Sequence, residues 1–131
     1  RTLGIACRDL GSTTNITKAL EAEMTFLGFL LFADPPKTGI TGTIYHLENL
    51  GISLKIITGD NQRVATKIAQ QIGMTNFDIL TGSDLHQTSD AALLKRVNEV
   101  NIFAEVEPNQ KERIILALKK AGNVVGYLGD G

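Results

Sequence analysis

The sequence has 131 residues and a formal net charge of −1; the length fits one domain with its own core, and the charge excludes a strongly basic nucleic-acid-binding surface. Cys7 is the only cysteine, which excludes an internal disulfide. The longest apolar run, residues 26–33, is far shorter than the ~20 residues of a membrane-spanning helix, so we expect a soluble chain.

The first quarter of the chain predicts two strands. Apolar and smaller residues alternate over Thr2–Cys7, and residues 25–33 carry the strongest strand pattern in the sequence. A turn-rich segment, residues 9–17, lies between them. Asp34-Pro35-Pro36-Lys37 ends the second strand, because consecutive prolines cannot donate hydrogen bonds to a sheet.

After Lys37, helical and strand patterns alternate. Apolar residues at helical spacing predict helices over residues 40–50, 61–72, 90–100 and 108–121. Short apolar runs predict strands at residues 53–58, 77–80, 102–104 and 124–128, and residues 81–84 are expected to form a polar loop. This order predicts an α/β fold with a doubly wound, mostly parallel sheet.

Thr58-Gly59-Asp60 lies where a predicted strand ends and a helix begins. In open α/β sheets this edge is where ligands bind. The Thr58 hydroxyl and free backbone N–H groups at a helix start suit a phosphate. The Asp60 carboxylate would repel a phosphate unless it has a cationic partner, so the sequence directs attention to nearby lysines.

Lys111 and Asp130 are further candidates for chemistry. Lys111 falls in the first turn after Pro108, where the helix dipole disfavours a cation by ~0.3–1 kcal/mol. One interpretation is that Lys111 offsets the negative charge of Asp60, of a phosphate or of both; the other is that it is an ordinary surface lysine. Asp130 leaves an apolar run between two glycines, which suits either a Mg²⁺ ligand or a simple turn. Lys37 is open to the same two interpretations as Lys111.

Four motifs together resemble those of a known family. They are Asp34-Pro35-Pro36-Lys37, Thr58-Gly59-Asp60-Asn61, Glu107-Pro108-x-x-Lys111 and Gly129-Asp130-Gly131, in this order. The sequence resembles the phosphorylation domain of P-type cation-transporting ATPases, which belong to the haloacid dehalogenase superfamily, and it looks most like the magnesium-transporting members. The resemblance implies a haloacid dehalogenase-like, Rossmann-like sheet. It also implies that residues 1–33 are the end of a nucleotide-binding domain with a hinge strand, and that residues 34–131 are part of a phosphorylation domain.

The resemblance implies a role for each matching residue. Thr58 and Gly59 would hold the γ-phosphate and then the aspartyl-phosphate, Asp60 would organise the site with Lys111, and Lys111 would neutralise the transferred phosphoryl group. Asp130 would bind Mg²⁺. Asp34 and Lys37 would belong to the hinge that faces the nucleotide, with ATP and Mg²⁺ as the implied cofactors.

One departure from the family is large. The Asp-Lys-Thr-Gly-Thr motif, whose Asp accepts the phosphoryl group, is absent from the sequence. In the family its strand lies between the strand ending at Thr58 and the strand ending at Gly129, so we expect this chain to lack the central strand. The incomplete sheet would then recruit a substitute strand, pair with another copy, or be completed by sequence outside this chain.

The resemblance therefore implies a cytoplasmic catalytic fragment of an ATP-driven pump in a membrane, most simply the plasma membrane. Its partners would be ATP, the rest of the pump and a cation, best assigned as Mg²⁺, that moves through an absent membrane domain. The isolated chain would be inactive. The alternatives are a stand-alone regulatory module that binds phosphate and Mg²⁺ without catalysis and, less favoured because the nucleophile is missing, a small phosphatase of the same superfamily.

Overall fold

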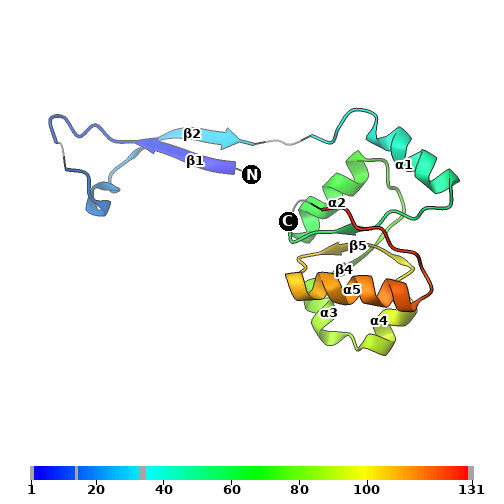
Figure 1. The fold of residues 1–131 in the computed structure, drawn as a ribbon. Coiled ribbons are helices and arrows are strands. Elements are labelled where there is room, and N and C mark those ends of the chain that lie inside the picture. Colours follow the sequence, from blue (N-terminus) through cyan, green and yellow to red (C-terminus); the bar gives the residue numbers. More distant parts are fainter. Residues whose placement is uncertain (1, 14, 33–34, 130–131) are drawn as a thin grey trace. The chain divides into compact units, whose positions relative to one another are not determined.

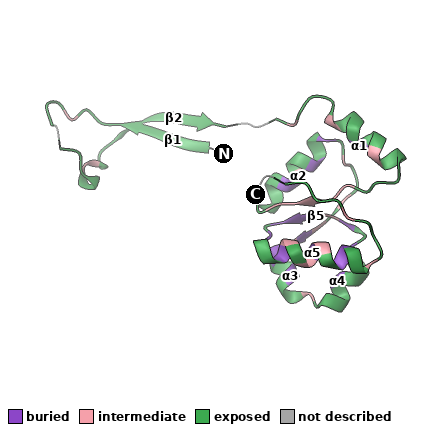
Figure 2. Cartoon of the chain, in the orientation of Figure 1, coloured by how far each residue is buried: buried purple, intermediate pink, exposed green. Residues whose placement is uncertain are grey.

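The computed structural model describes residues 2–13, 15–32 and 35–129, in two units that span Arg1–Pro35 and Pro36–Gly131. The first unit is an antiparallel hairpin of β1 (Thr2–Cys7) and β2 (Thr25–Leu31), with a short 3₁₀ helix, η1 (Lys18–Leu20), between them (Figure 1). Both predicted strands are confirmed. Nearly all of their residues are exposed, and Phe29 is 70% exposed (Figure 2).

The second unit contains a parallel three-stranded sheet and five helices. The strands are β3 (Ile56–Ile57), β4 (Asp78–Thr81) and β5 (Val100–Ala104), in the order β3-β5-β4. The helices are α1 (Ile40–Asn49), α2 (Gln62–Gln71), α3 (Gly82–Gln87), α4 (Asp90–Arg96) and α5 (Pro108–Lys120). The predicted α/β fold with a parallel sheet is confirmed.

Helices cover both faces of this sheet, with α2 on one side and α3, α4 and α5 on the other (Figure 1). Successive residues of β5 point to opposite faces. Ile102 packs with Ala65 and Ala69 of α2, whereas Phe103 packs in the cluster that contains Ile114 of α5. Buried residues are therefore concentrated on β5 and on the helix faces that look toward it (Figure 2).

The helix ends follow the local sequence signals. The Asn61 side chain accepts a hydrogen bond from the Val64 N–H at 3.0 Å, and Ser89 caps α4 through the Ala92 N–H at 3.3 Å. Pro108 opens α5, and Gly122 follows it with a φ of +88°, a left-handed conformation that favours glycine.

The predicted polar loop at residues 81–84 is wrong. Helix α3 begins at Gly82, and Thr81 and Asp84 form a reciprocal capping box at its start. The spacing Thr-x-x-Asp is itself a signal for a helix start. That signal was present in the sequence, but the short helix that follows has too few apolar residues to show a helical period.

The predicted strand at residues 124–128 is not formed, and the strand predicted over residues 53–58 is reduced to Ile56–Ile57. Val124 is 104% exposed and Leu128 is 100% exposed. Strand β3 pairs only with β5 and lies at the edge of the described sheet. Neither segment has a second strand beside it in the described sheet, and a strand is stable only where an adjacent strand satisfies its backbone groups.

Candidate functional site

The carboxyl ends of β3 and β5 lie at one edge of the sheet because the two strands are parallel. Backbone hydrogen bonds continue past the end of β3. The Thr58 N–H donates to the Phe103 carbonyl at 2.9 Å, and the Val106 N–H donates to the Thr58 carbonyl at 3.0 Å. The loop that carries Thr58-Gly59-Asp60 is thereby joined to the segment that leads into α5.

Thr58 and Asp60 are joined by two hydrogen bonds. The Thr58 hydroxyl donates to Asp60 Oδ2 at 3.1 Å and accepts from the Asp60 N–H at 3.0 Å. The carboxylate is exposed, and the threonine side chain is held in one direction by this pair of bonds. Asp60 thus orients the Thr58 hydroxyl.

Lys111 lies in the first turn of α5, which starts at the same edge of the sheet, and it is half-buried. Its ammonium does not come within 4.0 Å of the Asp60 carboxylate, and no other acidic side chain in the described part of the chain pairs with it. The joint action of Asp60 and Lys111 therefore stays a prediction.

Gly59 has room beside it. Its φ is not in the left-handed region, and a Cβ added there would meet only the Val106 carbonyl oxygen, at 3.7 Å. Its N–H has no hydrogen-bond partner among the described residues. Neither backbone conformation nor packing in this chain demands a glycine here, so the position is open for a ligand to approach the main chain.

Two N–H groups at the start of α2 are already occupied. The Gln62 N–H donates to Glu105 Oε1 at 3.1 Å, and the Val64 N–H donates to Asn61 Oδ1 at 3.0 Å. The expectation of free N–H groups at this helix start is therefore wrong for Gln62 and Val64.

Comparison with known proteins shows the family of the chain. Residues 6–131 match the haloacid dehalogenase-like hydrolase family. The chain belongs to the haloacid dehalogenase-like hydrolases.

Named relatives are P-type ATPases. The chain is 43% identical to "Magnesium-transporting ATPase, P-type 1" of Salmonella typhimurium strain LT2, over 100% of the chain and 15% of that protein. It is 37% identical to the protein of the same name from Escherichia coli K12, over 87% and 13%, and 38% identical to "Calcium-transporting ATPase 1" of Saccharomyces cerevisiae, over 92% and 13%. The resemblance to P-type ATPases is confirmed, and the chain spans about one seventh of the length of these relatives.

Three predicted site residues of this haloacid dehalogenase-like chain remain, and only one of them, Lys37, is among the described residues. Asp34 and Asp130 lie outside the described residues. Lys37 is exposed just before α1, where its carbonyl accepts from the Ile40 N–H at 3.2 Å. The described residues contain no group of three His, Cys, Asp or Glu side chains that could hold a metal ion, and none of their helices has the length and apolar character to cross a bilayer.

Two residues that position α5 were not predicted from the sequence. Gln110 is only 4% exposed, and its Nε2 donates to the Gly82 carbonyl at 2.9 Å. Arg113 donates to Asp90 Oδ1 at 2.7 Å and to the Leu85 carbonyl at 2.7 Å. Polar residues on a helix usually face solvent, so the sequence pattern of α5 did not predict these contacts. The contacts hold in place the helix that bears Lys111.

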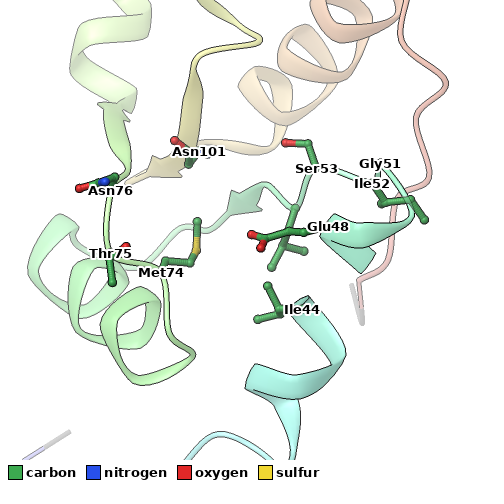
Figure 3. Close-up of a pocket in the computed structure, with 10 residues that line it drawn as sticks. Ile44, Glu48, Gly51, Ile52, Ser53, Met74, Thr75, Asn76 and Asn101 are labelled. Carbon is green, nitrogen blue, oxygen red and sulfur yellow. The ribbon is translucent and has the colours of Figure 1, made fainter. Parts of the chain in front are cut away.

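A pocket lies at the opposite edge of the sheet. A cavity of about 350 Å³ lies between α1 and the segments that enter β3, β4 and β5, where Glu48 points toward Met74 (Figure 3). Nearby on this edge, Lys55 Nζ donates to the Asn98 and Val100 carbonyls at 2.8 and 2.7 Å, and burial lowers the pKa of its ammonium. None of the predicted site residues lines this cavity.

Proposed function

We propose that this chain is part of the cytoplasmic catalytic region of a P-type ATPase, which couples ATP hydrolysis through an aspartyl-phosphate to cation transport across a membrane, with Mg²⁺ as the transported ion. The identity to magnesium-transporting and calcium-transporting ATPases supports this assignment. The phosphorylated Asp would come from outside this sequence, because the motif that carries it is absent.

The observation that carries the proposal is the junction of the two loops at the carboxyl edge of the sheet. It brings Thr58 and Gly59, which offer a held hydroxyl and an N–H without a described partner, to the edge where α5 begins with Lys111. A phosphoryl group bound there would accept from the Gly59 N–H, and from the Thr58 hydroxyl in place of the Asp60 carboxylate, while the ammonium offsets its charge. Such positioning and electrostatic stabilisation is most of what phosphoryl transfer requires of a protein.

Two cofactors belong to the proposal. ATP would supply the phosphoryl group, with Asp34 and Lys37 on the side of the nucleotide. Mg²⁺ favours one or two carboxylates with water and phosphate oxygens. A single carboxylate from Asp130 suits that preference, and the ion would then neutralise phosphate charge.

A phosphate titration of the 131-residue chain tests the site. Inorganic phosphate, with and without Mg²⁺, is added while amide chemical shifts are followed by NMR. We expect the Gly59 amide to shift, and Lys111→Ala to weaken binding by about tenfold because a charge-assisted contact is lost. Lys120→Ala, an exposed lysine in the last turn of the same helix, is the control and should bind as the parent does. A parent chain that leaves the Gly59 amide unmoved up to high phosphate would contradict the proposed site.

The encoding gene tests the wider assignment. Membrane-spanning segments and an Asp-Lys-Thr-Gly-Thr motif encoded in frame with this sequence would agree with a pump. A short open reading frame without them would favour the regulatory module that binds phosphate and does not catalyse.

A further inference from the structure

Glu105 occupies an unusual position between β5 and α5. Its φ is +58°, and apart from Glu23 it is the one non-glycine residue in the described chain with a positive φ. The left-handed conformation costs a residue with a side chain roughly 1–2 kcal/mol, and it persists only where surrounding contacts determine it. Here those contacts come from three different segments.

The main chain of Glu105 makes two of them. Its N–H donates to the Asp60 carbonyl at 2.9 Å, which holds the Thr58-Gly59-Asp60 loop. Its carbonyl oxygen packs so closely on Gly82 that a Cβ added to that glycine would lie 2.2 Å from it. The residue therefore bridges the loop after β3 and the start of α3.

The side chain makes the third contact. Glu105 Oε1 accepts the Gln62 N–H at 3.1 Å, so a carboxylate of the protein sits where the positive end of the α2 dipole would attract an anion. Asn61 occupies the Val64 N–H in the same turn. These two N–H groups are thereby closed to a phosphate, whereas the Gly59 N–H has no partner among the described residues.

We infer that Glu105 is a positioning residue, which ties the phosphate loop at Thr58-Gly59-Asp60 to the start of α2 and to the segment leading to Lys111. The inference rests on the proposed function, because it concerns how that same site is held. Glu105 itself does not touch the phosphate. Its carboxylate acts by occupying the Gln62 N–H, and its left-handed backbone directs its own N–H to Asp60.

Three variants of the full 131-residue chain separate the side chain from the backbone. Glu105→Gly removes the carboxylate and relieves the backbone strain, so it should fold even if Glu105→Ala does not. Glu105→Gln keeps an oxygen that can accept the Gln62 N–H. Glu112→Ala removes an exposed glutamate of α5 that has no described hydrogen bond, and it serves as the control.

The first readout is amide hydrogen exchange by NMR, which needs no ligand. In Glu105→Gly we expect the Gln62 amide to exchange about fivefold faster, because one hydrogen bond is lost. The Val64 amide, held by Asn61, should stay unchanged. Glu105→Gln should restore exchange at Gln62 to within about twofold of the parent. If Glu105→Gly and Glu112→Ala leave the Gln62 amide equally protected, the inference is overturned.

The second readout is the inorganic phosphate titration. We expect Glu105→Gly to weaken phosphate binding about fivefold, through misplacement of the loop, and Glu105→Gln to recover it. If the parent chain binds no phosphate, the proposed function fails, and hydrogen exchange alone decides whether Glu105 holds the loop. If the parent binds phosphate and Glu105→Gly binds it equally well, the positioning role is wrong.

Discussion

The Val106 N–H donates to the Thr58 carbonyl at 3.0 Å, and together with the bond from the Thr58 N–H to the Phe103 carbonyl it extends the pairing of β3 and β5 beyond the last residue of β3. Val106 is 4% exposed, so the bond lies against the core. The consequence is that the Thr58-Gly59-Asp60 loop and the entrance to α5 share one support. A substitution in either segment is therefore expected to displace the other.

Gly59→Ala should separate binding from stability. The backbone at Gly59 is not left-handed, and an added Cβ would lie at an ordinary contact distance, 3.7 Å, from the Val106 carbonyl oxygen. The free energy of unfolding should therefore stay level or rise by about 0.4–1 kcal/mol. Phosphate affinity should fall by about tenfold, because the methyl group occupies the approach to the main chain. Chemical denaturation and an NMR titration measure the two effects. Equal phosphate affinity in the variant would show that the ligand does not approach Gly59.

Gly82→Ala should destabilise the chain by about 2–3 kcal/mol, since the new Cβ would lie 2.2 Å from the Glu105 carbonyl oxygen and 2.9 Å from Gln110 Oε1. Gly42→Ala is the matched control. Gly42 lies inside α1 with nothing within 4 Å of the added Cβ, so this change should raise stability by up to about 1 kcal/mol. Urea midpoints compare the two variants, and similar midpoints would refute the close packing at Gly82.

Arg113→Ala should lower the free energy of unfolding by about 1.5–3 kcal/mol. The guanidinium donates to the carbonyls of Leu85 and Thr88 and pairs with Asp90 at 2.7 Å, and loss of hydrogen bonds to a charged group is costly when the group is half-buried. Arg113→Lys should recover only part of the loss, because an ammonium cannot reproduce the fork of donors. Arg63→Ala, an exposed arginine without a described partner, should change stability by less than about 0.5 kcal/mol. Thermal and urea denaturation measure all three.

Stability should depend on the charge of Asp84. Hydrogen bonds from the Thr81 hydroxyl at 2.6 Å and the Thr81 N–H at 2.8 Å lower the pKa of the Asp84 carboxyl below its usual range. A lowered folded-state pKa means that this stabilisation is present above the ordinary pKa and is lost as pH falls through the folded-state value. Asp84→Asn should therefore flatten the fall in urea midpoint on acidification below about pH 4. Glu112→Gln should not, and an unchanged slope in Asp84→Asn would remove Asp84 as the cause.

The incomplete sheet predicts self-association. Strand β3 is at the edge of the described sheet, and Val124 and Leu128, in the segment after α5, are fully exposed. Unpaired strands and exposed apolar side chains favour pairing with another copy. Sedimentation velocity across a concentration series should show dimers in the parent and fewer in Val124→Lys/Leu128→Lys. A parent that stays monomeric at all concentrations would argue that this edge does not pair with a second copy.

Local sequence signals predicted the individual elements well where each signal lies inside the element. The apolar period and Pro108 predicted α5, and the alternation over Thr2–Cys7 predicted β1. Prediction failed where an element depends on a neighbour. Residues 124–128 have a strand-like composition, yet no adjacent strand in the described part of the chain satisfies their backbone groups.

The site was predicted only in part for the same reason. Thr58-Gly59-Asp60 was recognisable as the end of a strand before a helix, and Asn61 as the start of that helix. The carboxylate on the Gln62 N–H could not be predicted, because Glu105 comes from another loop and its charge alone is typical of an exposed residue.

The amino-acid sequence by itself determined the alternation of strands and helices, the starts of α2, α4 and α5 and the place of the Thr58-Gly59-Asp60 loop at the end of a strand, since hydrophobic period and capping chemistry act over a few neighbouring residues. The tertiary structure alone decided which N–H groups remain free, how Glu105 links three segments and which polar side chains hold α5. Those features depend on how segments that are distant in sequence are aligned with one another. The alignment decides which polar groups meet, and polar groups that become buried form hydrogen bonds with the partners they meet.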